Sequence, residues 1–101
     1  MTFSVKVVRR AVVQIDEAAA WWVKNRRDAP EAIREELQIA LDLIARHPNI
    51  GAKALNFKLR EVRRIHLSRI RYYLYYRVRV EAKTVEVLAF WHTSRAAQPN
   101  L

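Results

Sequence analysis

All four tyrosines of the chain and three of its arginines lie in one short segment, IRYYLYYRVRV at 70–80. Guanidinium groups bind phosphate or carboxylate oxygens through paired hydrogen bonds, and tyrosine rings stack on bases or apolar groups while offering a hydroxyl. Residues 53–79 carry nine Lys/Arg and one acid, Glu61. This composition indicates a surface that binds a nucleic acid or an acidic peptide. The alternative is an exposed sheet face that uses Arg and Tyr as ordinary strand residues.

The same residues could supply part of a metal-free ribonuclease. Such an enzyme needs groups that activate the 2′-hydroxyl, protonate the leaving oxygen and neutralise the transition-state phosphate. His92 could be the acid, and four arginines could neutralise the phosphate: Arg64, Arg71, Arg77 and Arg95. Glu61 and Lys58 are possible bases, but no spacing links them to the other groups. His92 can equally be a structural hydrogen-bonding residue beside Trp91.

Other kinds of site find no support in the sequence. The three histidines, His47, His66 and His92, lie far apart, and the chain has no cysteine and no HExxH motif. A single glycine excludes a Gly-rich phosphate loop, and no serine lies in a nucleophile elbow. We therefore expect neither a metal ion nor a cofactor.

Charge is distributed unevenly along the chain. Residues 1–52 carry eight Lys/Arg against seven Asp/Glu, whereas residues 53–101 carry eleven against three, so most of the net charge of +9 lies in the second half. Such a surface attracts a polyanion. The lack of cysteine, of a signal-length apolar N-terminus and of a membrane-spanning stretch predicts a soluble, cytoplasmic protein. The length of 101 residues predicts one domain, 1–101.

The tyrosines and arginines are predicted to lie on a strand of an antiparallel sheet. Residues 59–67, 69–80 and 84–94 are rich in β-branched and aromatic residues and are separated by hairpin-length gaps, which predicts a meander. Alternation assigns one face of the middle strand to Ile70, Tyr72, Leu74, Tyr76, Val78 and Val80. It assigns the other face to Arg71, Tyr73, Tyr75, Arg77 and Arg79. We expect Tyr72 and Tyr76 to face the helices.

The last predicted strand is apolar on both sides. Alternation assigns one side to Val85, Val87, Ala89 and Trp91, and the other to Leu88, Phe90 and His92. One helical hairpin can cover only one of these sides. A partner is expected to cover the second.

The first half predicts a short strand and two helices. Residues 3–8 are β-branched, and apolar residues recur at helical spacing over 10–25, where Trp22 falls on the core stripe. Asp28 and Glu31, with Pro30 between them, have the spacing of a capping box for a second helix. That helix has a stripe of Ile33, Leu37, Ala40, Leu41 and Ile44. The predicted class is α+β: an N-terminal strand, an antiparallel helical hairpin, then a three-stranded antiparallel meander.

Two segments, RRIHLSRIRYYLYYRV and VEVLAFWHTSRAAQP, resemble the RelE/ParE superfamily of type II toxins. That superfamily commonly carries Arg-Tyr-x-x-Tyr-Tyr-Arg-Val, then Val-x-x-Trp-His-x-x-Arg followed by a proline. The matching positions are Arg71, Tyr72, Tyr75, Tyr76, Arg77, Val78, Trp91, His92, Arg95 and Pro99. HPNIG at 47–51 resembles the Pro-x-x-Gly that ends the second helix of the family. The resemblance covers nearly the whole chain and implies the same β-α-α-β-β-β order.

The resemblance implies a bacterial toxin that a cognate, acidic, ParD-like antitoxin neutralises in a hetero-oligomer. The Trp-His-x-x-Arg motif, without a lysine pair or a C-terminal tyrosine, is closer to the ParE branch, whose members poison DNA gyrase and are not enzymes. The first alternative is a RelE-like, ribosome-dependent mRNA endoribonuclease that uses the four arginines and His92. The second is a non-toxic basic interaction module. Residues expected to bind the target or antitoxin are Arg63, Arg64, Arg71, Tyr73, Tyr75, Arg77, Trp91, His92 and Arg95.

Overall fold

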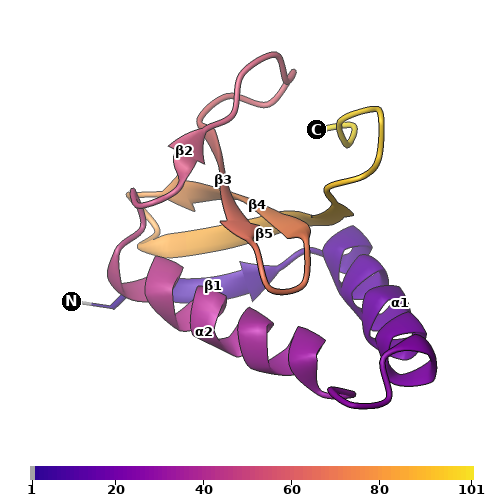
Figure 1. Ribbon diagram of the computed structural model, residues 1–101. Coiled ribbons are helices and arrows are strands. Elements are labelled where there is room, and N and C mark those ends of the chain that lie inside the picture. Colours follow the sequence, from indigo (N-terminus) through magenta and orange to yellow (C-terminus); the bar gives the residue numbers. More distant parts are fainter. Residues whose placement is uncertain (1) are drawn as a thin grey trace.

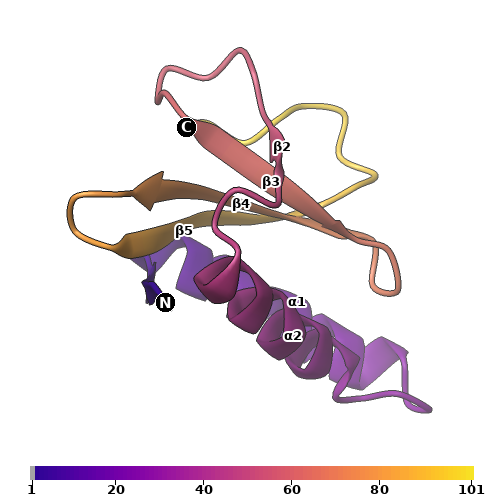
Figure 2. The same ribbon diagram turned by 90° about the vertical axis from the view of Figure 1, so that its left-hand side faces the viewer.

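The computed structural model describes residues 2–101 as an α+β fold, in which two helices cover one face of a five-stranded sheet (Figures 1 and 2). The elements in chain order are β1 (Ser4–Val7), α1 (Arg9–Asn25), α2 (Ala32–Arg46), β2 (Ala52–Lys53), β3 (Val62–Leu67), β4 (Tyr72–Arg79) and β5 (Thr84–His92). The strand order is β1-β5-β4-β3-β2. The predicted class is therefore confirmed, and the two-residue strand β2 is an addition to it.

The sheet combines a meander with a strand from the other end of the chain. β3, β4 and β5 pair antiparallel in succession, as predicted. β1 pairs parallel with β5, with Ser4 opposite Thr84 and Val7 opposite Val87. The helices between β1 and the meander supply the long crossover that parallel neighbours need. They also bury their apolar sides against the sheet.

The start of α2 differs from the predicted capping box. The helix begins at Ala32, and its N-cap residue Glu31 makes no side-chain capping hydrogen bond. Backbone bonds close the connecting turns instead, from Ala29 N to Arg26 O at 3.2 Å and from Ala32 N to Ala29 O at 3.1 Å. The Asp28 prediction is wrong because successive backbone turns already connect the two helices.

Two apolar clusters lie on opposite faces of the sheet. The main core joins both helices to the sheet and contains Tyr76, with Tyr72 packed against it. The smaller cluster lies on the face away from the helices and contains Tyr75, with Tyr73 packed against it. The expectation that Tyr72 and Tyr76 face the helices is therefore confirmed.

A β-bulge in β5 changes which side chains share a face. Tyr75 pairs with Ala89 while the next residue, Tyr76, pairs with Val87, so Leu88 is an extra residue. Val87 lies in the main core, whereas Ala89 lies in the smaller cluster with Leu88. The regular alternation predicted for this strand is wrong beyond Val87.

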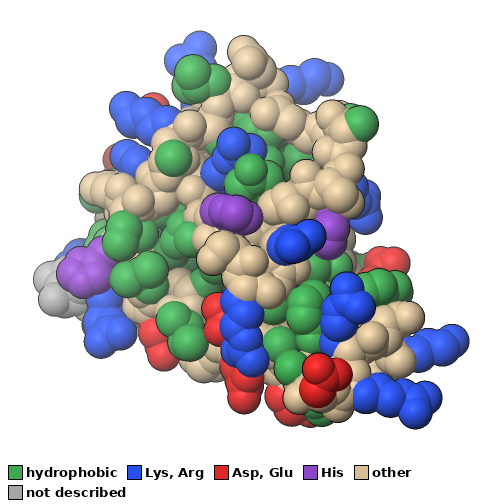
Figure 3. All heavy atoms as spheres, in the orientation of Figure 1, with side chains coloured by type: hydrophobic (Ala, Val, Ile, Leu, Met, Phe, Trp, Pro, Cys, Tyr) green, Lys and Arg blue, Asp and Glu red, His purple; other side chains and the backbone are tan. Residues whose placement is uncertain are grey.

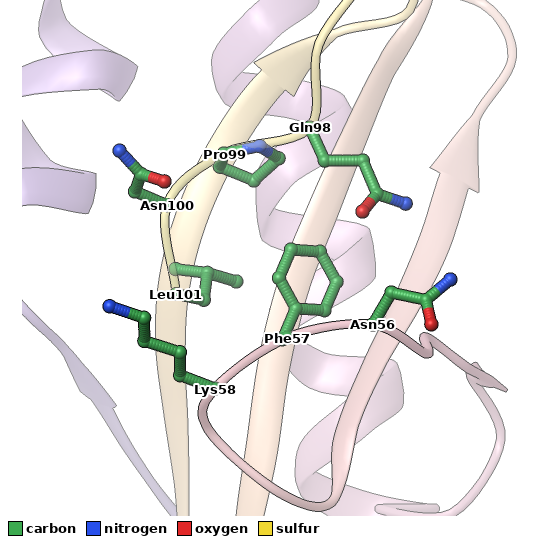
Figure 4. Close-up of a pocket in the computed structure, with 7 residues that line it drawn as sticks. All are labelled: Asn56, Phe57, Lys58, Gln98, Pro99, Asn100 and Leu101. Atoms are coloured by element: carbon green, nitrogen blue, oxygen red, sulfur yellow. The ribbon is translucent and has the colours of Figure 1, made fainter.

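The chain itself covers the smaller cluster. Phe57 and Leu59, from the segment between β2 and β3, and Leu101, from the C-terminus, pack against Tyr75 and its neighbours. The backbone nitrogen of Leu59 donates to the carbonyl of Leu101 at 3.3 Å, and Figure 4 shows this segment and the C-terminal residues facing one another. The expectation that a partner supplies this cover is wrong for the part of the sheet over Tyr75.

Candidate functional site

The sheet face away from the helices carries Arg64, Tyr73, Tyr75, Arg77 and Arg79, a set that we call the arginine face. The Arg64 guanidinium lies 4.1 Å from the centroid of the Tyr73 ring, and its Nη1 donates to the Tyr75 hydroxyl at 3.2 Å. Tyr73 remains partly exposed, whereas Tyr75 is only 1% exposed. Arg64 and Tyr73 therefore offer a charge and a ring to a partner, while Tyr75 mainly orients Arg64.

Arg77 is held by a carboxylate at the far end of the arginine face. Its Nε donates to Glu86 Oε1 at 2.6 Å, and Arg79 Nη1 lies 3.5 Å from the same oxygen. The hydrogen bond from Arg77 holds the pKa of the Glu86 carboxyl below its usual value. This ion pair largely neutralises Arg77, which is therefore a poor phosphate ligand.

Arg63 forms hydrogen bonds with the backbone of the segment between α2 and β2. Its Nη1 donates to the carbonyls of Asn49 and Gly51, at 3.1 Å and 2.7 Å. Next to it, the Tyr76 hydroxyl donates to the carbonyl of Pro48 and accepts from the Gly51 nitrogen, both at 2.8 Å. These bonds fix the segment that leads into β2.

Arg71 lies outside the strand on which it was predicted. It occupies the turn between β3 and β4 with φ of 61°, and its carbonyl accepts from Thr93 N at 3.0 Å. A positive φ is unusual for a side chain with a Cβ. Arg71 is consequently not part of the arginine face, which corrects the prediction.

Arg71 instead lines a cleft of about 550 Å³ between the end of α1 and the ends of the central strands. We call this site the tryptophan cleft, and its side chains are Trp21, Trp22, Arg26, Arg69, Arg71 and His92. A smaller hollow of about 250 Å³ shares Trp21 and His92 with it and adds Glu17, Tyr72, Phe90 and Arg95. The two hollows therefore adjoin.

The groups around His92 define its chemistry. Its Nδ1 accepts from the Ser94 backbone nitrogen at 3.1 Å and lies 2.6 Å from Ser94 Oγ, so the neutral ring carries its proton on Nε2. The ring stands edge-on to Tyr72, 5.0 Å between centroids. Burial raises the pKa of the Tyr72 phenol, against the opposing charge of Arg95. Burial therefore favours the neutral phenol of Tyr72 over the phenolate.

The two bases considered from the sequence lie away from His92. Lys58 lines a different hollow, between the segment before β3 and the C-terminal residues (Figure 4). Glu61 occupies the turn before β3 with φ of 63°. The carboxylate that does line the His92 hollow is Glu17, which the sequence analysis did not single out. Its position one helical turn before Trp21 was the available signal.

Trp91 and Arg95 lie together where β5 ends. The Arg95 guanidinium lies 4.0 Å from the Trp91 ring centroid, and Trp91 Nε1 donates to the carbonyl of Ala97 at 2.9 Å. Trp91 packs with the cluster on the arginine-face side, whereas Arg95 also lines the hollow beside His92. Arg95 therefore connects the two candidate surfaces.

Most of the acidic side chains visible in Figure 3 lie in its lower part, over the helices, with Lys and Arg side chains among them. Within residues 2–101, no group of three or more His, Cys, Asp or Glu side chains could hold a metal ion. Among the same residues, no helix is both long and apolar enough to cross a membrane.

Comparisons with solved structures define the class of fold. The chain superposes on a ParDE toxin-antitoxin system from P. aeruginosa with a TM-score of 0.73 and 20% identity, over 92% of this chain and 98% of the other. The intact E. coli RelBE toxin-antitoxin complex gives 0.67 and 22% over 92% and 99%, and an archaeal RelE-RelB complex from Pyrococcus horikoshii gives 0.61 and 18% over 95% and 100%. At these identities the matches establish the fold alone.

The family follows from the sequence as a whole. A family model described as the ParE toxin of the type II toxin-antitoxin system parDE matches residues 5–97. The chain belongs to this toxin family, which confirms the resemblance seen in its motifs. A search of curated proteins finds no match.

Proposed function

We propose that this chain arrests bacterial growth by inhibiting DNA gyrase, and that an acidic, ParD-like antitoxin neutralises it in a hetero-oligomer. The observation that carries the proposal is the division of the candidate ribonuclease residues into groups that do not meet. His92 pairs across the sheet with Tyr72, whereas Arg77 pairs with Glu86 five residues further along β4. Five residues along a strand span about 17 Å, so His92 and Arg77 lie about that far apart along the sheet.

The remaining groups support binding better than catalysis. A ribonuclease needs a base within hydrogen-bonding reach of the reacting hydroxyl. Burial raises the pKa of Tyr72 and Lys58 lies at a separate hollow, so Glu17 is the carboxylate left to act as a base beside His92. Arg64 and Tyr73, by contrast, present a stacked cation and ring from a rigid sheet, which suits recognition of an acidic protein surface or a nucleic-acid backbone.

An antitoxin partner is supported by surface chemistry and by the neighbours. The structure from P. aeruginosa is described as a ParDE system, in which a toxin is paired with an antitoxin. Several apolar side chains of the helices are exposed, at 42% for Val12, 49% for Val13 and 62% for Ile39. The apolar side of an amphipathic antitoxin segment would cover such side chains, and acidic residues elsewhere in the antitoxin would bind the arginine face.

The test is controlled expression in bacteria, with and without the adjacent antitoxin gene, together with assays of the purified chain. We expect growth arrest that the antitoxin relieves, and inhibited supercoiling by purified gyrase. Arg64→Ala should weaken the inhibition at least about tenfold, as loss of a charge-assisted contact does. Arg34→Ala, which removes an exposed arginine from α2, is the matched control.

An mRNA endoribonuclease is the second candidate, because Arg71, His92 and Arg95 do line adjoining hollows. It requires codon-positioned mRNA cleavage on ribosomes that fails in Arg95→Ala. Cleavage of this kind with normal supercoiling would overturn the gyrase proposal. Harmless expression at high level would instead favour the non-toxic interaction module.

A further inference from the structure

The tryptophan cleft contains arginine side chains that no described acidic residue neutralises. Arg69 is engaged on its outer side, with Nη1 lying 3.2 Å from Glu35 and 3.0 Å from Glu36. Arg26 and Arg71 form no ion pair among residues 2–101, nor does Arg95 in the adjoining hollow. Three unneutralised guanidinium groups therefore line two adjoining hollows, an arrangement that suits an anion.

The cleft also offers an aromatic surface. Trp21 is 48% exposed and lines both the cleft and the adjoining hollow. The Arg26 guanidinium lies 5.3 Å from the Trp21 ring and 5.8 Å from the Trp22 ring. A planar ligand can stack on Trp21 while its charged part reaches the arginines.

One indole N–H near the cleft lacks a hydrogen-bond partner within residues 2–101. The Trp22 Nε1 atom has less than 1 Å² exposed and no hydrogen-bond partner among the described residues, although Trp22 lines the cleft. A buried indole N–H normally finds an acceptor, and leaving it without one costs about 1–3 kcal/mol. A ligand that reached this atom by moving the Trp22 side chain would remove this cost.

The backbone of Arg71 indicates that its position is maintained at the expense of stability. With φ of 61°, a residue with a Cβ is strained by about 1–2 kcal/mol relative to glycine. Residues held in such conformations gather at ligand sites. Here the strained turn brings a guanidinium to the cleft instead of to the arginine face.

We propose that the tryptophan cleft and the hollow beside it bind a free nucleoside polyphosphate, whose base stacks on Trp21 and whose phosphates contact Arg26, Arg71 and Arg95. The volume of the cleft, about 550 Å³, lies in the range of small-molecule sites, and the adjoining hollow adds about 250 Å³. Glu17, which lines the smaller hollow, is placed to accept a hydrogen bond from a ribose hydroxyl or a base amino group. Arginine side chains replace the Gly-rich loop that this chain lacks.

A compact nucleotide fits better than a polynucleotide. Single strands are bound by grooves that follow the backbone over several nucleotides. The arginines here instead line two adjoining hollows, from the end of α1 and the turn before β4 in the tryptophan cleft and from the residues after β5 in the smaller hollow. The inference does not depend on the cellular target, because it concerns a ligand of the isolated chain.

The test is calorimetric titration of the purified full-length chain with ATP, adenosine, inorganic triphosphate and an oligothymidylate, each without metal ion. We expect ATP to bind at least about tenfold more tightly than adenosine or triphosphate. The Trp21 ring resonances should move on addition of ATP, since the base stacks on that exposed side chain. Inhibition of gyrase is measured in a separate assay. The nucleotide proposal and the gyrase proposal can therefore be refuted independently of each other.

Two variants identify the site. Arg71→Gly removes the guanidinium and relieves the positive φ, so it should weaken ATP binding at least about tenfold without lowering the unfolding temperature. Trp21→Ala should weaken ATP but not triphosphate. Arg60→Ala, an exposed arginine outside the cleft, is the control. Unchanged ATP binding in Arg71→Gly, tighter binding of oligothymidylate than of ATP, or equal binding of ATP and triphosphate would each overturn the proposal.

Discussion

Replacing Tyr76 by phenylalanine isolates the bonds that fix the segment after α2. The hydroxyl donates to the Pro48 carbonyl and accepts from the Gly51 nitrogen, both at 2.8 Å, and the Tyr76 side chain is 0% exposed. Each bond contributes about 0.5–1.5 kcal/mol, and a buried N–H left without an acceptor costs about 1–3 kcal/mol. We therefore expect Tyr76→Phe to lower the free energy of unfolding by about 2–4 kcal/mol.

Urea unfolding followed by tryptophan fluorescence measures this loss. For a domain of this size, the thermal midpoint should fall by about 10–20 °C. Tyr73→Phe is the matched control, because the Tyr73 hydroxyl has no partner among residues 2–101, and it should change stability by less than about 0.5 kcal/mol. Equal effects of the two substitutions would refute the reasoning that these bonds hold the segment.

Three further changes test other parts of the structure. A Cβ at Gly51 would lie 2.6 Å from the Tyr76 hydroxyl oxygen, so Gly51→Ala should destabilise the fold by about 1–3 kcal/mol in the same urea assay. Because the folded-state pKa of Glu86 is below its usual 4.5, its ion pair stabilises the fold above that pH and is lost as pH falls through the lower folded value. Glu86→Gln should therefore cost about 1–2 kcal/mol at pH 7 and almost nothing near pH 2, measured by thermal melts across that range. Removal of residues 98–101 uncovers the cluster around Tyr75 and should lower the urea midpoint while raising the binding of a hydrophobic dye.

The order of elements followed from the sequence because periodicity and turn residues act locally. The stripe of α2, the three strands of the meander and the sidedness of Tyr72 and Tyr76 all result from spacing within one element. The bulge at Leu88 did not, because the extra residue is set by pairing with β4 and leaves no local mark. The sequence failed to predict the position of Arg71 for a similar reason. Nothing in a run of arginines and tyrosines shows which residue has a positive φ.

The candidate site was predictable only in part. His92 and Arg95 were singled out by residue type, and their place at the end of β5 follows from the strand. Glu17, Trp21 and Arg26 join them only because α1 packs across that end of the sheet, which is a tertiary contact. The partner of Arg77 was equally hidden, because Glu86 becomes its neighbour through strand register.

The pairing of β1 with β5 has a consequence for the order in which the protein is made. Ser4 is synthesised 80 residues before the residue opposite to it, Thr84. Synthesis proceeds at about 5–20 residues per second, so the first strand waits several seconds for its neighbour. A nascent chain therefore has no completed sheet until β5 has been synthesised and has left the ribosome.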